Sequence, residues 1–162
     1  MSRRLRSLLA AVLLLAGCAE LQDAGPITVR QALFGLGERA AERVAEAPPL
    51  PQPPIDQVLL LAMPEVDTTF SLAPERLLES LTRALLGLEP GPQVLDWGPS
   101  LAQGGGENQW RLDSRLVADG PRLTLSDRTL LPYRLQLSLR RPGGDRPLWS
   151  TELAGALDAS AL

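Results

Sequence analysis

Histidine and lysine are absent from this chain of 162 residues, and Cys18 is its only cysteine. Without histidine, no Ser-His or Cys-His nucleophile pair can form, and a zinc site built from imidazoles is excluded. Without lysine, Schiff-base chemistry is excluded, and a single thiol cannot close a disulfide within the chain. Hydroxyls, carboxylates and arginines remain for chemistry. We therefore expect a protein that is not an enzyme and holds no cofactor and no metal.

Paired carboxylates are the catalytic arrangement that this composition leaves open. A glycan-cleaving enzyme needs two carboxyl groups about 5–10 Å apart in a cleft. No spacing in the sequence singles out a pair among the candidate acids, which are Glu65, Asp67, Asp96, Glu107 and Asp113. Hydrolysis is therefore the weakest of the functional hypotheses.

The first 18 residues have the layout of a signal peptide. Three arginines precede an apolar run at residues 8–16, which is shorter than the ~20 residues of a membrane-spanning helix. The run ends in Leu15-Ala16-Gly17-Cys18, which resembles the lipobox of bacterial lipoproteins. This resemblance implies cleavage before Cys18 and acylation of that cysteine. Ala19 in the next position implies an outer-membrane location, with the protein facing the periplasm.

The charge of the chain argues against nucleic acid as a partner. The formal net charge is −3, and removal of residues 1–17 takes away three arginines and brings it to −6. Domains that bind nucleic acid carry a basic face. We expect a protein partner instead.

Composition divides the chain into three parts: a signal peptide at 1–17, a lipidated tether at 18–55 and a globular domain at 56–162. Within the tether, apolar residues at three- and four-residue steps predict an amphipathic helix over 27–47. This helix would present either a packing face or a membrane-surface face. The proline-rich segment 48–54 predicts an extended spacer, with a proline-rich recognition motif as the alternative.

The pattern of the domain predicts an α+β fold. Residues 58–63 are apolar without alternation, which indicates a central strand buried on both faces. A helix with one apolar face is predicted from about Pro74 to Leu88, and a second short strand at 93–97. From Trp110 the period becomes two, and a turn cluster at 141–146 indicates a hairpin. We expect a small mixed or antiparallel sheet, β-α-β and then an antiparallel meander, covered by one main helix.

Three pieces of this pattern resemble the LpoB-type activators of penicillin-binding proteins, whose fold is related to the TolB N-terminal domain. They are residues 58–61 leading to Asp67-Thr68-Thr69, the helix at 73–88, and the closing hairpin from 133–137 to Trp149-Ser150. The resemblance covers most of residues 56–158. It implies a non-catalytic outer-membrane lipoprotein that binds and regulates a peptidoglycan synthase.

The contact surface of such a regulator would be the polar face of the predicted sheet or the main helix. Arginine is enriched at protein interfaces, and the polar face of the predicted sheet carries the candidate partner-binding residues Arg111, Arg115, Arg134 and Arg140. The same arginines also fit a solvated face that is balanced by Asp113 and Asp119. The alternative function is a structural accessory subunit of an outer-membrane assembly or export complex, for which the helix at 27–47 would supply an apolar packing face.

Overall fold

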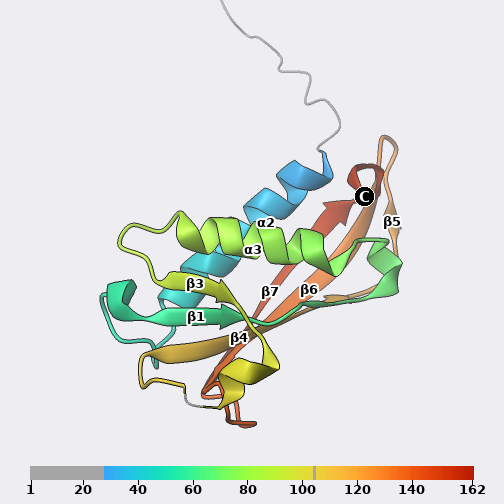
Figure 1. Cartoon of the computed structure of the whole chain (residues 1–162). Helices are drawn as coiled ribbons and strands as arrows, with labels where there is room; N and C mark the ends of the chain where they lie inside the picture. Colours follow the sequence, from blue (N-terminus) through green and yellow to red (C-terminus); the bar gives the residue numbers. More distant parts are fainter. Residues whose placement is uncertain (1–27, 104) are drawn as a thin grey trace, which may run out of the picture.

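The computed structural model describes residues 28–103 and 105–162, so the lipobox and its flanks lie outside the described residues. The α+β class is confirmed, because one seven-stranded mixed sheet carries two helices on the same face (Figure 1). The helices are α2 (Val29–Ala45) and α3 (Pro74–Leu86). The strands are β1 (Val58–Leu61), β2 (Glu65–Val66), β3 (Gln93–Asp96), β4 (Gln109–Ala118), β5 (Leu123–Thr124), β6 (Thr129–Arg140) and β7 (Trp149–Asp158). Short 3-10 turns are η1 (Pro54–Asp56), η2 (Thr68–Phe70), η3 (Pro99–Ala102) and η4 (Ala159–Ala161).

The sheet joins a parallel half to an antiparallel half. Strands run in the order β3-β1-β4-β6-β5, with β7 paired to β6 and β2 paired to β4. β1 is parallel to β3 and to β4, whereas β6 is antiparallel to β4 and to β7. The prediction of a central strand is confirmed, because every residue of β1 is buried and β1 has a partner on each side. No helix of residues 28–103 or 105–162 is long and apolar enough to cross a membrane.

The helix predicted at 27–47 is present as α2, but its assignment to the tether is wrong. Thr28 begins it with a capping box, in which its hydroxyl accepts from the Gln31 amide N–H and the Gln31 side chain accepts from the Thr28 amide N–H. One face of the helix packs into the core of the domain through Leu33, Leu36, Gly37, Ala40, Ala41 and Val44. Its apolar stripe therefore covers the sheet next to α3, so two helices cover this face rather than the single main helix expected.

The proline-rich segment 48–54 is also corrected, because it is a compact turn and not an extended spacer. Leu50 is buried, and its amide N–H donates to the carbonyl of Ala47. The Gln52 side chain donates to the carbonyl of Ala45 over 2.7 Å, which closes the turn onto the end of α2. The apolar side chain of Leu50 drives this fold-back, since burying a leucine stabilises by about 1.5–3 kcal/mol.

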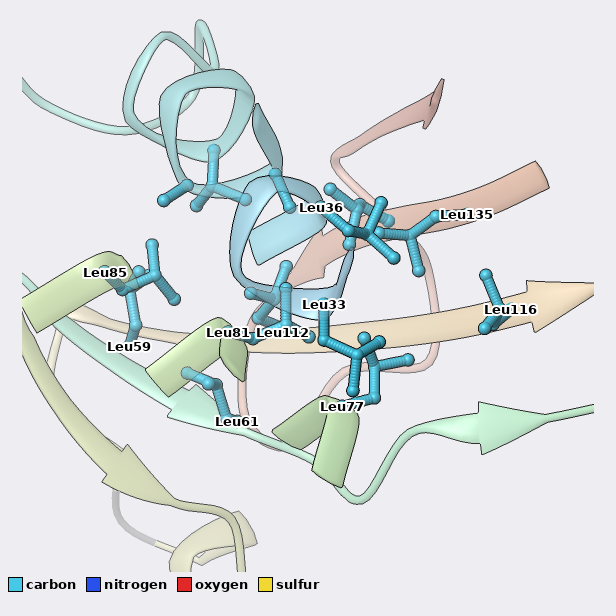
Figure 2. Packing of buried hydrophobic residues seen from close by; sticks show 14 of the residues in the cluster. Leu33, Leu36, Leu59, Leu61, Leu77, Leu81, Leu85, Leu112, Leu116 and Leu135 are labelled. Carbon is cyan, nitrogen blue, oxygen red and sulfur yellow. The ribbon is translucent and has the colours of Figure 1, made fainter. Parts of the chain in front are cut away.

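Leucines from both helices and the sheet form one core (Figure 2). Leu33 and Leu36 of α2 lie among leucines of α3, β1, β4 and β6 in this view. The two helices meet closely at Gly37. A Cβ added there would lie 2.6 Å from Ser80 Oγ and 2.8 Å from the Ser80 carbonyl oxygen. Ser80 Oγ in turn donates to the Leu33 carbonyl over 2.6 Å, which ties α3 to α2.

Tyr133 is the only tyrosine of the chain, and it is buried in this core. Its register partner is Gly155 on β7, and a Cβ at Gly155 would lie 2.5 Å from the phenol oxygen. Glycine is therefore needed at 155 to leave room for the ring. The Arg39 guanidinium of α2 donates to the phenol oxygen, which joins α2 to the sheet. Burial raises the pKa of Tyr133, while the charge and the hydrogen bond of Arg39 lower it in part.

We expect Tyr133 to ionise above its ordinary pKa of 10.0 in the folded protein. The folded pKa is raised above the unfolded one, so this group stabilises the fold fully below pH 10, and the contribution is lost as pH rises beyond it. Arg39→Gln removes the positive charge, the larger of the two influences that lower the pKa, so the midpoint moves further up. Tyrosinate absorbance measures the midpoint, with circular dichroism at each pH reporting that the fold persists. A lower midpoint in Arg39→Gln than in the parent would contradict this picture.

Candidate functional site

The structure brings the four predicted arginines onto the face of the sheet that points away from the helices. In the β4–β6 register, Arg111 pairs with Arg140, Arg115 with Gln136, and Val117 with Arg134. Their neighbours in the strands, such as Leu112 and Leu135, point into the core on the opposite face. The predicted alternation is therefore confirmed, and its polar half forms one continuous surface over β4, β6 and β7. We call this surface the polar sheet face.

Two arginines of the polar sheet face converge on Asp113. Nε of Arg111 donates to Oδ1 of Asp113 over 2.9 Å. Nε of Arg140 lies 2.7 Å from Oδ2, but its N–H is not aligned with that oxygen, so this contact is an ion pair and not a hydrogen bond. The Arg111 guanidinium also lies over the ring of Trp97, 4.6 Å from the centroid, which is within cation–π range. Because two cations share one carboxylate, this cluster carries an excess of positive charge.

The other two arginines are more exposed and are also paired. Arg134 makes an ion pair with Asp119, and its Nη1 lies 3.5 Å from a carboxylate oxygen of Glu152. Nε of Arg115 lies 3.2 Å from a carboxylate oxygen of Glu65 at the edge of the face. The balance by Asp113 and Asp119 is thus observed, and Glu65 and Glu152 add to it. The polar sheet face is charge-balanced overall, with exposed pairs that contribute only about 0–1 kcal/mol each.

Three of the carboxylates considered for hydrolysis, Glu65, Asp67 and Asp113, make structural contacts. Asp113 is held between two arginines. Asp67 caps η2, where its Oδ1 accepts from the amide N–H of Thr69 over 2.8 Å and from the hydroxyl of Thr69 over 2.6 Å. These hydrogen bonds lower the pKa of Asp67, whereas a general acid needs a raised pKa.

A groove between α2 and α3, which the sequence analysis missed, is the second candidate site. It has a volume of about 630 Å³, within the range of small-molecule sites. Its apolar walls are made by Val29, Leu33, Phe34, Leu72 and Leu162, and its charged residues are Arg30, Arg76, Glu79 and Arg83. Leu162 lines the groove directly after η4. The turn η4 is capped by Asp158, whose side chain accepts from the Ser160 amide N–H.

No signal in the sequence could have located this groove. Its two walls belong to segments 47 residues apart at the Leu33–Ser80 contact, and one wall was assigned to the tether.

Of the charged residues that line the groove, Glu79 pairs with Arg83 over 2.6 Å. Among the described residues, no ion pair involves Arg30 or Arg76, and both arginines are exposed.

Comparisons with known proteins show no family for this chain. No protein-family model matches it, and no curated protein matches it. Among solved structures, it is similar to lipoprotein GNA1162 from Neisseria meningitidis, with 12% identity, a TM-score of 0.46, and coverage of 64% of this chain and 85% of that one. It is also similar to protein XCC0632 of family DUF330 from Xanthomonas campestris, with 14% identity, a TM-score of 0.46, and coverage of 70% and 78%.

Proposed function

We propose that this chain is a non-catalytic lipoprotein subunit that binds a protein of the cell envelope beside the outer membrane, to which Cys18 anchors it. The observation that supports this most directly is how soon the folded domain begins. Thr28 is already part of the α2 cap, and it follows Cys18 by ten residues. Ten residues span at most about 36 Å when fully extended. The partner must therefore present its surface close to the anchoring membrane.

The polar sheet face is the surface that we assign to this partner. It is accessible over β4, β6 and β7, and it presents arginines, which are enriched at protein interfaces. Its exposed ion pairs are weak, so Arg134 or Arg115 can exchange a carboxylate of this chain for one of the partner at little cost. An outer-membrane assembly or export complex, of which this chain would be a structural accessory subunit, is the partner class that fits this short reach.

Regulation of a peptidoglycan synthase is the second candidate function. It is favoured by the segments that resemble LpoB-type activators, which are β1 leading to η2, helix α3, and the β6–β7 hairpin. An inner-membrane synthase lies across the periplasm from the anchor. With α2 and segment 48–54 built into the domain, the tether left to bridge that gap is much shorter than the 37 residues from Cys18 to Ile55.

Photo-crosslinking from native membranes tests these proposals. A crosslinker replaces Gln136 on the polar sheet face, and the matched control carries it at Glu42, an exposed residue of α2. We expect an envelope protein to be captured from position 136 and not from position 42. A captured outer-membrane assembly or export component supports the first candidate, and a penicillin-binding protein supports the second. Equal capture from both positions would reject the polar sheet face as the binding surface.

The anchor is tested separately. Palmitate labelling and membrane fractionation of the parent and of Cys18→Ala show whether the cysteine carries the lipid. We expect the label and the membrane-bound fraction to disappear together in Cys18→Ala. A labelled or fully membrane-bound Cys18→Ala protein would refute the lipoprotein proposal.

A further inference from the structure

We propose that the groove between α2 and α3 binds an anionic phospholipid of the membrane that carries the anchor. The head group would lie at Arg30 and Arg76, and one acyl chain against Val29, Phe34 and Leu72. This inference rests on the proposed lipid anchor for its geometry, and it concerns a surface other than the polar sheet face. It gives the protein a second membrane contact, which fixes how the domain sits on the bilayer.

The shape and the chemistry of the groove fit such a ligand. Its volume of about 630 Å³ is enough for part of a lipid, and its lining combines apolar side chains with arginines and hydroxyls. Phe34 lines the groove and keeps 47% of its surface exposed, whereas the opposite, apolar face of α2 packs into the core. An apolar wall beside an exposed aromatic ring suits a hydrocarbon chain better than a polar ligand.

The charge of the groove is opposite to that of the protein. Among the side chains that line it, Arg30, Arg76 and Arg83 outnumber the single acidic one, Glu79, which is already paired with Arg83. The chain without its signal peptide carries a formal charge of −6, so a basic groove is a local exception. Glu75 lies outside the groove in a neighbouring hollow of α3. Charge complementarity therefore favours an anionic head group at Arg30 and Arg76.

The position of the groove brings it to the membrane. Thr28 and Val29 line it, and they are the described residues nearest in sequence to Cys18. α2 begins at the same end of the molecule as the C-terminus and β5 (Figure 1). The end of the domain that carries the groove is thus the end held within about 36 Å of the lipid anchor.

Vesicle flotation tests the proposal without the anchor. The protein is residues 19–162, which retains every described residue, and the vesicles contain either phosphatidylglycerol and phosphatidylcholine or phosphatidylcholine alone. We expect binding to the anionic vesicles only. Each arginine near an anionic surface contributes about fivefold in affinity, so Arg30→Gln with Arg76→Gln should weaken binding about 25-fold. The matched control is Arg115→Gln with Arg134→Gln on the polar sheet face, which removes the same charge.

The outcomes separate this proposal from its alternatives. The proposal is supported if Arg30→Gln with Arg76→Gln loses binding to the anionic vesicles, the control pair does not, and Phe34→Ser also weakens binding. An equal loss of vesicle binding in both double variants would show general charge attraction and overturn the proposal. Absence of binding to either vesicle, or a stable dimer that Phe34→Ser dissociates, would also overturn it. None of these results bears on palmitate labelling at Cys18 or on crosslinking from Gln136, so the proposed function fails or survives independently.

Discussion

Replacing Leu36 with alanine is expected to lower the free energy of unfolding by about 2–5 kcal/mol. Leu36 is fully buried in the layer between α2 and the sheet. Truncation removes its contacts and leaves a cavity that the surrounding leucines can fill only in part. Domains of this size are stable by only about 5–15 kcal/mol, so the loss is a large part of the total. Urea unfolding followed by the fluorescence of the three tryptophans measures it.

Phe34→Ala is the matched control for this prediction. Phe34 lies on the same helix, two residues away, but is 47% exposed. Its truncation should change the free energy of unfolding by less than half as much as that of Leu36. If α2 were part of a tether, both variants would leave the stability of the domain unchanged. Equal and small effects would therefore contradict the packing of α2 into the core.

Gly37→Ala and Gly35→Ala are expected to change stability in opposite directions. At Gly35 an added Cβ meets nothing within 4 Å, so alanine should stabilise the helix by about 0.5–1 kcal/mol. At Gly37 the added Cβ lies 2.8 Å from the backbone carbonyl oxygen of Ser80, which cannot rotate away. The helices must separate, which strains the packing and the Ser80–Leu33 hydrogen bond. We expect Gly37→Ala to destabilise by about 1–3 kcal/mol.

Thermal unfolding of the two glycine variants provides the measurement. Each 1 kcal/mol corresponds to a shift of roughly 2–8 °C in Tm for domains of about this size. The two variants share the same change in helix propensity, so their difference isolates the contact between α2 and α3. A higher Tm for both variants would mean that the two helices are not in close contact at Gly37.

The contact of α2 with the domain changes how the protein is expected to work. With α2 and segment 48–54 in the tether, the anchor would allow a long reach. With both packed into the domain, the reach shortens to ten residues, and the polar sheet face is held near the anchoring membrane. For the same reason, deletion of residues 27–47 would remove part of the core and would not simply shorten a tether.

The sequence by itself determined the local elements. The unbroken apolar run of β1, the helical period of α2 and α3, and the period of two in β4 and β6 each depend only on which residues follow one another. The polar sheet face followed from the same alternation. Odd-numbered residues of β4 lie opposite even-numbered residues of β6, as Arg111 lies opposite Arg140, so the polar residues of both strands share one face. Local periodicity therefore predicted the α+β class and placed all four candidate arginines on one face.

Only the tertiary structure decided where α2 goes, how the proline-rich segment folds and that a groove exists. An apolar stripe on a helix can pack against a membrane, a partner or its own domain equally well. The sequence pattern shows which side chains will be buried, but it does not show which surface will cover them. The decision depends on contacts across long separations, such as Gly37 with Ser80 and Arg39 with Tyr133. The domain boundary and the groove follow from these contacts, because burial in the core fixes α2 beside α3.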